Sequence, residues 1–173
     1  LAEQGYLCAY CMTPLEDAPD TVKIEHYTPR DSDNELIYKN LLAVCYGGKG
    51  KPYKEQTCDT HKGKTVLIID PQNKSHTDQI YYGMDGAIRT RNARIQADLD
   101  NVLNLNCVRL KGVRKQVLMA FCAVMKRDKQ DKTASKGYLE KKLQTYQERQ
   151  HGRYSSYCGI LIWYLQRRIR QCS

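Results

Sequence analysis

Glu25 and His26 place a carboxylate beside an imidazole in the stretch 21–30, where polar and apolar residues alternate until Pro29. These side chains suit proton transfer and the binding of a metal ion or a phosphate. The alternation predicts a strand over residues 21–27, and neighbours on a strand point to opposite faces. The pair can therefore share a ligand only where the strand ends, which Pro29 brings about. The alternative is a histidine that is merely hydrogen bonded at a strand end, but the flanking residues favour a catalytic role.

Four cysteines surround this stretch. Cys8 and Cys11 are separated by two residues and followed by Pro14, while Cys45 ends an apolar run and is separated from Cys58 by twelve residues. Two such pairs can bind one tetrahedral zinc ion. A thioredoxin-type redox pair is the alternative, but it needs a long helix after the dithiol, which Pro14 and the acidic turn after it disfavour. We therefore predict a structural Zn²⁺ held by all four cysteines, although the long gap before Cys58 is not that of a simple knuckle.

Further polar residues stand at the ends of the neighbouring elements. Asn40 precedes the apolar run 41–45, a predicted strand, and can tie down the loop before it through side-chain hydrogen bonds to the backbone. Asp59 follows Cys58 where helical character begins, so it can bind a metal ion or only cap the helix. Lys62 lies one helical turn further on. The Gly- and Lys-rich residues between 46 and 57 are expected to form an exposed insertion.

Together these motifs resemble the signature of the HNH nucleases, which have the ββα-metal or His-Me finger fold, here braced by a four-cysteine zinc site. The motif covers roughly residues 5–65. Residues 45–50 and 103–114 also resemble PtuB, the nuclease subunit of Septu-type bacterial defence systems that is also found beside retrons. This resemblance is to a narrower group of proteins, and it extends more weakly to about residue 125. The combination is specific, although each piece alone would be weak.

The resemblance implies a role for each residue. His26 matches the general base that deprotonates the attacking water, and Asn40 matches the asparagine that braces the loop and orients it. Glu25 and Asp59 occupy the positions that hold a catalytic Mg²⁺ or Mn²⁺, which would stabilise the departing oxygen. Most relatives carry Asn or His at position 59, so the additional carboxylate here should make activity strictly dependent on metal.

The resemblance also implies a substrate and a partner. Lys62 and Arg30 are expected to contact the substrate phosphate, and the substrate is nucleic acid, either DNA or RNA including tRNA. The implied partner is an ATPase subunit resembling PtuA, in an anti-phage complex in the bacterial cytoplasm, and no membrane is involved. The alternative is a catalytically inert, zinc-stabilised module that binds nucleic acid or protein. The tyrosines could stack on bases, yet most are as well explained by the edges of the core.

Charge and periodicity describe the rest of the 173 residues. Lys and Arg number 12 against 15 acidic residues in 1–108, and 16 against 4 in 109–173, so the C-terminal third carries the whole positive excess. A polyanionic partner or a solubilising surface would each explain it. Residues 79–89 predict a hairpin around Asp85 and Gly86. Helices are predicted at 94–103, 108–125, 138–149 and 157–170, with a loop at 131–137. The core candidates of the second helix are Val117, Leu118, Phe121, Val124 and Met125. Four later cysteines are interpreted as small buried hydrophobic residues, namely Cys107, Cys122, Cys158 and Cys172.

We therefore expect an α+β protein in two parts. Residues 1–75 would form the zinc-braced ββα-metal core, and residues 76–173 a hairpin followed by a basic, mainly helical region. No apolar run reaches the length of a membrane span.

Overall fold

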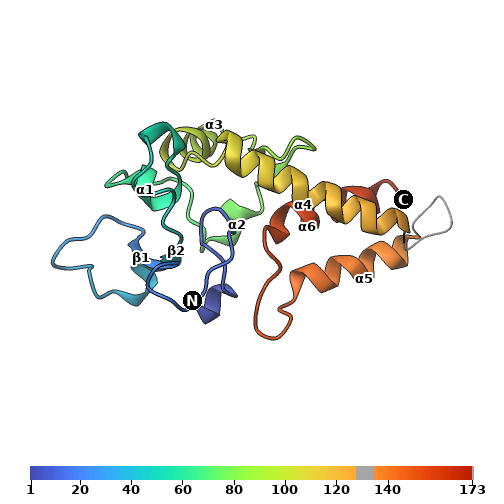
Figure 1. Cartoon of the computed structure of the whole chain (residues 1–173), viewed down its shortest axis with the longest axis horizontal. Helices are drawn as coiled ribbons and strands as arrows, with labels where there is room; N and C mark the ends of the chain where they lie inside the picture. The colour runs from blue at the N-terminus through green and yellow to red at the C-terminus, as the bar shows by residue number, and fades with distance from the viewer. Residues whose placement is uncertain (128–134, 173) are drawn as a thin grey trace.

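The computed structural model describes residues 1–127 and 135–172, and it mixes short strands with helices. β1, β2 and α1 gather at one end of the molecule, and α4 runs from there toward α5 and α6 (Figure 1). Most of the expected loop at 131–137 falls outside the described residues. The elements are β1 (Lys23–His26), β2 (Leu41–Val44), α1 (Cys58–Lys62), α2 (Lys74–Thr77), β3 (Tyr81–Tyr82), β4 (Ile88–Arg89), α3 (Ala93–Ala97), α4 (Val108–Arg127), α5 (Lys136–Gln147) and α6 (Cys158–Arg170), with short helical turns η1 (Ala2–Gln4), η2 (Tyr38–Asn40), η3 (Tyr53–Glu55) and the π-helical η4 (Asp98–Val102).

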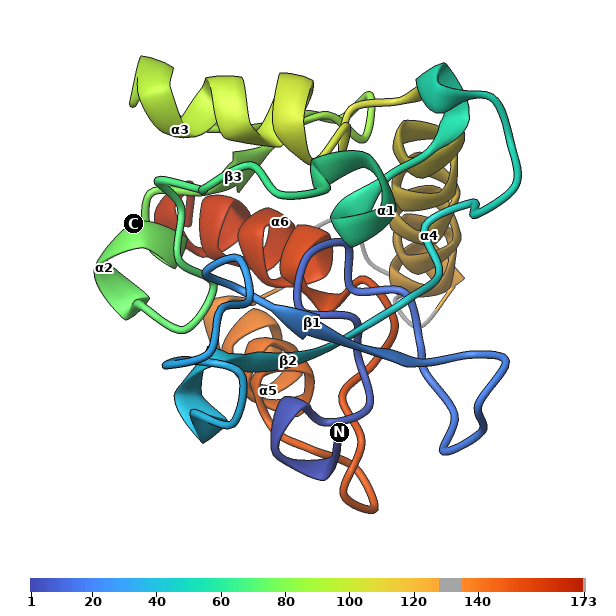
Figure 2. The same ribbon diagram turned by 90° about the vertical axis from the view of Figure 1, so that its left-hand side faces the viewer.

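The predicted strand is β1, and it pairs with β2 in an antiparallel hairpin. Glu25 stands opposite Leu42, and His26 opposite Leu41. An alternating strand normally buries its apolar residues. Here the order is reversed, because Glu25 is buried whereas Ile24 is 72% exposed. The inner face of the hairpin therefore presents a carboxylate to α1, which lies across from it (Figure 2).

The four predicted helices are present with shifted ends. The first is divided into α3 and η4, and the others are α4, α5 and α6. On α4, Leu118 and Phe121 are buried, but Val124 is 39% exposed, so its place in the predicted core was wrong. Helical geometry puts Leu118, Phe121 and Met125 on one stripe and turns Val124 away from it.

The later cysteines differ in burial. Cys158 is buried and Cys107 and Cys122 are partly buried, as expected for small hydrophobic side chains, whereas Cys172 is exposed. The interpretation of Cys172 as a buried residue was therefore wrong. Cys172 lies beyond Arg170, the last residue of α6.

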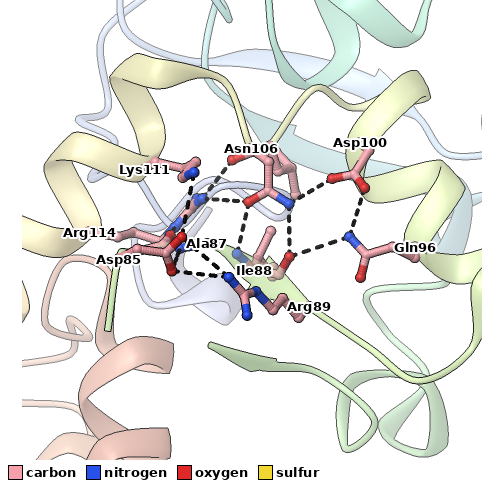
Figure 3. Close-up of polar contacts among 11 residues, drawn as sticks. Asp85, Ala87, Ile88, Arg89, Gln96, Asp100, Asn106, Lys111 and Arg114 are labelled. Atoms are coloured by element: carbon pink, nitrogen blue, oxygen red, sulfur yellow. Dashed lines mark hydrogen bonds and ion pairs between the residues drawn. The ribbon is translucent and has the colours of Figure 1, made fainter. Parts of the chain in front are cut away.

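A polar network fastens the hairpin of β3 and β4 to the helices (Figure 3). Asn106 accepts a bond from the Ile88 amide at 2.8 Å and donates to the Ile88 carbonyl at 2.9 Å. The buried Arg114 donates to the carbonyls of Gly86 and Leu105, each at 2.6 Å. Gly86 has a φ of 82°, and this turn confirms the hairpin predicted at residues 85 and 86. The network holds the segment before α4 against the hairpin.

A single cluster of buried side chains runs through the described residues. It joins Cys8 and Cys58 near the strands to Leu118 on α4, Leu139 on α5 and Leu165 on α6. The segments 1–75 and 76–173 thus share packed surface, although the boundary between them stays a prediction. No helix in the described ranges has the length and apolar character needed to cross a membrane.

Candidate functional site

Cys8, Cys11, Cys45 and Cys58 come together beside the hairpin. Their four sulfur atoms all lie within 4.8 Å of one another. The Cys8–Cys58, Cys11–Cys45 and Cys45–Cys58 sulfur separations are 3.9, 3.7 and 3.8 Å. Four sulfurs placed tetrahedrally at the usual Zn–S distance of about 2.3 Å would be about 3.8 Å apart. The cluster therefore fits a zinc ion, and a redox pair would not need all four cysteines.

The protonation of these thiols depends on their neighbours. Hydrogen bonds from Cys11 and Cys58 lower the pKa of Cys45, while burial raises the pKa of Cys8. Sulfurs this close cannot all ionise unless a cation compensates their charge. Zinc binding to the cluster should therefore release protons and contribute directly to folding.

Residues outside the cluster support it. The Thr13 hydroxyl lies 3.0 Å from the Cys11 sulfur and 2.9 Å from the hydroxyl of Tyr157, the residue that precedes α6. The Arg109 guanidinium of α4 donates to the Thr57 hydroxyl at 3.2 Å, and the Cys58 amide donates to the Leu103 carbonyl at 2.9 Å. The helical part of the chain thus helps to position the sulfur ligands.

Glu25 of β1 and Asp59 of α1 face each other between the hairpin and the helix. Each carboxylate shifts the pKa of the other, so the two side chains lie close together. Each is also paired with a lysine: the Lys62 amine lies 2.7 Å from Glu25, and Lys23 forms an ion pair with Asp59. The Tyr10 hydroxyl donates to Glu25 at 3.1 Å. The two carboxylates supply the oxygen donors that Mg²⁺ prefers, and two lysines hold them in the described structure.

The environment shifts the ionisation of both carboxylates. Burial and the contact with Asp59 raise the pKa of Glu25 to about 7, against the lowering effect of Lys62. Burial acts to raise the pKa of Asp59 as well, but hydrogen bonds to Glu25 and Lys23 outweigh it and lower that pKa. Burial and Glu25 together raise the pKa of Tyr10. Of the two carboxylates, Asp59 therefore carries the charge more readily.

His26 ends β1 with its ring turned to the following loop. Its Nε2 atom lies 3.0 Å from the carbonyl oxygen of Glu35. A carbonyl can only accept, so this bond assigns the proton to Nε2 and leaves Nδ1 of the neutral ring as the basic nitrogen. Glu25 is buried on the inner face of β1 whereas the His26 ring is partly exposed. A ligand shared by the two at the strand end stays a prediction.

Asn40, the last residue of η2, braces the same loop from just before β2. The buried side chain accepts from the Thr28 amide at 2.7 Å and donates to the Thr28 carbonyl at 3.0 Å, while the Asn40 carbonyl accepts from the Tyr27 amide at 2.9 Å. These contacts hold the backbone directly after His26. Asn40 is therefore placed where it can fix the direction of that side chain.

The two residues expected to contact a phosphate are placed differently. Arg30 is exposed, and its closest acidic partner, Glu35, is 3.8 Å away. The Lys62 side chain is only 1% exposed and is engaged by Glu25. Arg30 is thus open to a substrate, whereas Lys62 is enclosed.

Two residues of the site were missed in the sequence. Tyr10 lies inside the Cys8–Cys11 turn, which was considered only for its sulfurs, and Lys23 lies on the predicted strand but was given no role in the site. The position of Lys23 two residues before Glu25 was a usable signal for its side of the strand. No local pattern marks Tyr10, because its partner Glu25 comes from another element.

Comparison with known proteins supports the nuclease interpretation. No protein-family model matches the chain. The chain is similar to an Escherichia coli protein named "Retron Ec83 putative HNH endonuclease", with 29% identity over 163 residues. The match covers 69% of this chain and 62% of the relative, so the chain spans less than two thirds of the relative's length. The resemblance to HNH endonucleases is thereby confirmed, whereas the closer resemblance to PtuB stays a prediction.

Proposed function

We propose that this chain is a metal-dependent HNH nuclease that hydrolyses phosphodiester bonds in nucleic acid, built on a ββα-metal fold. One observation carries the proposal: Glu25 and Asp59 lie close together between the β1–β2 hairpin and α1, and His26, which follows Glu25 at the end of β1, has Nε2 engaged by the Glu35 carbonyl. The similarity to the retron-encoded relative supports the same reaction class.

The residues divide the work of hydrolysis. Mg²⁺ or Mn²⁺ held by Glu25 and Asp59 would supply positive charge for the departing oxygen. His26 would accept the proton of the attacking water at Nδ1, since Nε2 donates to Glu35. Asn40 would hold the loop in which that bond forms.

Lys23, Lys62 and Arg30 would balance the negative charges of the two carboxylates and of the substrate phosphate. Lys23 and Lys62 neutralise the two carboxylates before a cation enters. Arg30 is the more accessible phosphate contact, and Lys62 could become one only after releasing Glu25. A rise in free lysine charge as the cation takes over the carboxylates would favour binding of a polyanion.

We further propose that the chain acts in a bacterial anti-phage system in the cytoplasm, together with an ATPase subunit resembling PtuA. The resemblance to Septu nuclease subunits supports this context. An ATPase from the same operon should co-purify with the chain and change its cleavage of labelled DNA or total RNA. Lack of both effects would exclude that partner.

The nuclease proposal is tested with purified, zinc-loaded protein on labelled DNA and RNA. Cleavage should require Mg²⁺ or Mn²⁺ and fall by at least about 100-fold in His26→Ala, because a general base contributes roughly that much. An unchanged melting temperature would show that the variant folds. Equal cleavage by both proteins would refute the role of His26.

The alternative function is a catalytically inert module that binds nucleic acid or protein. One observation favours it: both carboxylates are already paired with lysines, which occupy the oxygens that a catalytic metal ion would need. It predicts nucleic-acid binding that survives removal of Mg²⁺, with no cleavage under any divalent metal.

A further inference from the structure

Residues 46–57, which we call the insertion loop, form a folded projection between Cys45 and Cys58. The loop is closed at its base by a bond from the Thr57 amide to the Gly47 carbonyl at 2.8 Å. From outside, the Asn104 side chain donates to the carbonyls of Lys54 and Gln56 at 3.1 and 2.8 Å. The loop (teal) lies beside the start of α4 (Figure 2). Its shape is therefore set by several contacts before any ligand arrives.

The loop presents one aromatic side chain to solvent. Tyr53 is 64% exposed, and its ring stacks on that of His61 with centroids 4.1 Å apart and planes 20° from parallel. His61 is held in turn by its Nδ1 atom, 2.9 Å from the Val102 carbonyl. The His61 ring therefore supports that of Tyr53. The exposed surface of Tyr53 thus belongs to a ring whose orientation is already set.

Lysines flank this tyrosine in the sequence. The loop contains Lys49, Lys51 and Lys54 and a single carboxylate, Glu55. Lys51 and Lys54 are exposed, and neither forms an ion pair with any residue in the ranges 1–127 and 135–172. An oriented aromatic ring between unpaired lysines matches the alternation of bases and phosphates along a nucleic-acid strand.

We propose that the insertion loop binds single-stranded nucleic acid, with one base stacked on Tyr53 and adjacent phosphates on Lys51 and Lys54. The choice of a single strand follows from geometry, because the faces of bases inside a duplex are already covered by their neighbours. The inference rests on the proposed nuclease function, since α1 carries both His61 and the metal-binding candidate Asp59.

Binding is measured by fluorescence anisotropy with labelled 15-nucleotide single strands and the matching duplex, on zinc-loaded protein without Mg²⁺ so that no cleavage occurs. Tyr53→Ala should weaken single-strand binding by about 5- to 150-fold, the usual range for removal of one stacked base. Tyr53→Phe keeps the ring and should bind nearly as well as wild type. Tyr81→Ala, at another exposed tyrosine on β3, serves as the matched control. Zinc content and circular dichroism check that each variant folds.

The contribution of Lys51 and Lys54 is measured separately, from the salt dependence of binding. Replacing both Lys51 and Lys54 with Gln should reduce the slope of log affinity against log salt by about 0.7 for each phosphate that the variant no longer neutralises. Equal single-strand binding by wild type and Tyr53→Ala would overturn the proposal, and so would an equally large weakening of duplex binding. Failure of the nuclease proposal would appear instead as absence of metal-dependent cleavage by wild type, with binding through Tyr53 intact.

Discussion

Replacement of Lys62 by Met tests the charge balance at the centre of the site. The Lys62 and Glu25 side chains are 1% and 6% exposed, and their atoms are 2.7 Å apart. Removing one partner of a buried ion pair typically costs about 3–5 kcal/mol, because the remaining charge stays in the interior without compensation. We expect a loss of this size in the free energy of unfolding of zinc-loaded Lys62→Met, measured with urea at pH 8 without Mg²⁺.

The loss should depend on pH with a defined sign. Burial already raises the pKa of Glu25 to about 7 from a reference value of 4.5, and removal of Lys62 takes away an effect that lowers it. A folded-state pKa above the unfolded value means that the folded protein holds more protons, so stability falls as pH rises between the two values. Lys62→Met should therefore be less destabilised at pH 5 than at pH 8.

Controls separate this effect from the loss of side-chain packing. Lys51→Met, at an exposed lysine without an ion pair in the described structure, should change stability by less than about 0.5 kcal/mol. The double variant Glu25→Gln with Lys62→Met removes both charges and should recover part of the loss. Saturating Mg²⁺ should stabilise Lys62→Met more than wild type. A loss below about 1 kcal/mol at pH 8 would refute the ion pair as a buried, stabilising contact.

Four further predictions concern the zinc cluster, the polar network around α4 and a glycine within that helix. Cys58→Ser should remove most bound zinc, measured by elemental analysis as a fall from about one ion per chain, and should lower the melting temperature. Gly86→Ala should destabilise by at least about 2 kcal/mol in urea unfolding, because a Cβ there would meet the Lys111 carbonyl oxygen at 2.2 Å. Gly112→Ala, within α4 and with open space around it, should instead stabilise by roughly 0.5–1 kcal/mol in the same assay. Arg114→Met should cost about 2–4 kcal/mol in thermal unfolding, since two buried carbonyls lose their donor; an unchanged melting temperature would contradict the network.

Local patterns predicted much of the molecule correctly. Helices α4, α5 and α6, the turn at Gly86 and the start of α1 at Cys58 all follow from periodicity or turn residues, which act over a few positions of the chain. Burial was predicted less well, as the exposed Val124 and Cys172 show. Which face of a helix or strand is covered depends on the elements packed against it, and periodicity does not identify them.

The sequence by itself determined the types and the order of the groups in the site. Four cysteines, a Glu–His pair at a strand end, Asn40 and Asp59 can be read in order, because each is marked by its immediate neighbours. The tertiary structure decided how they meet. It buried Glu25 and left Ile24 exposed, which alternation alone would not predict. It also paired Lys23 and Lys62 with the two carboxylates, and it placed the Glu35 carbonyl where it accepts the proton of His26 Nε2. Charges and hydrogen bonds act between atoms a few ångströms apart, and only the folded chain brings residues from 23 to 62 within that range.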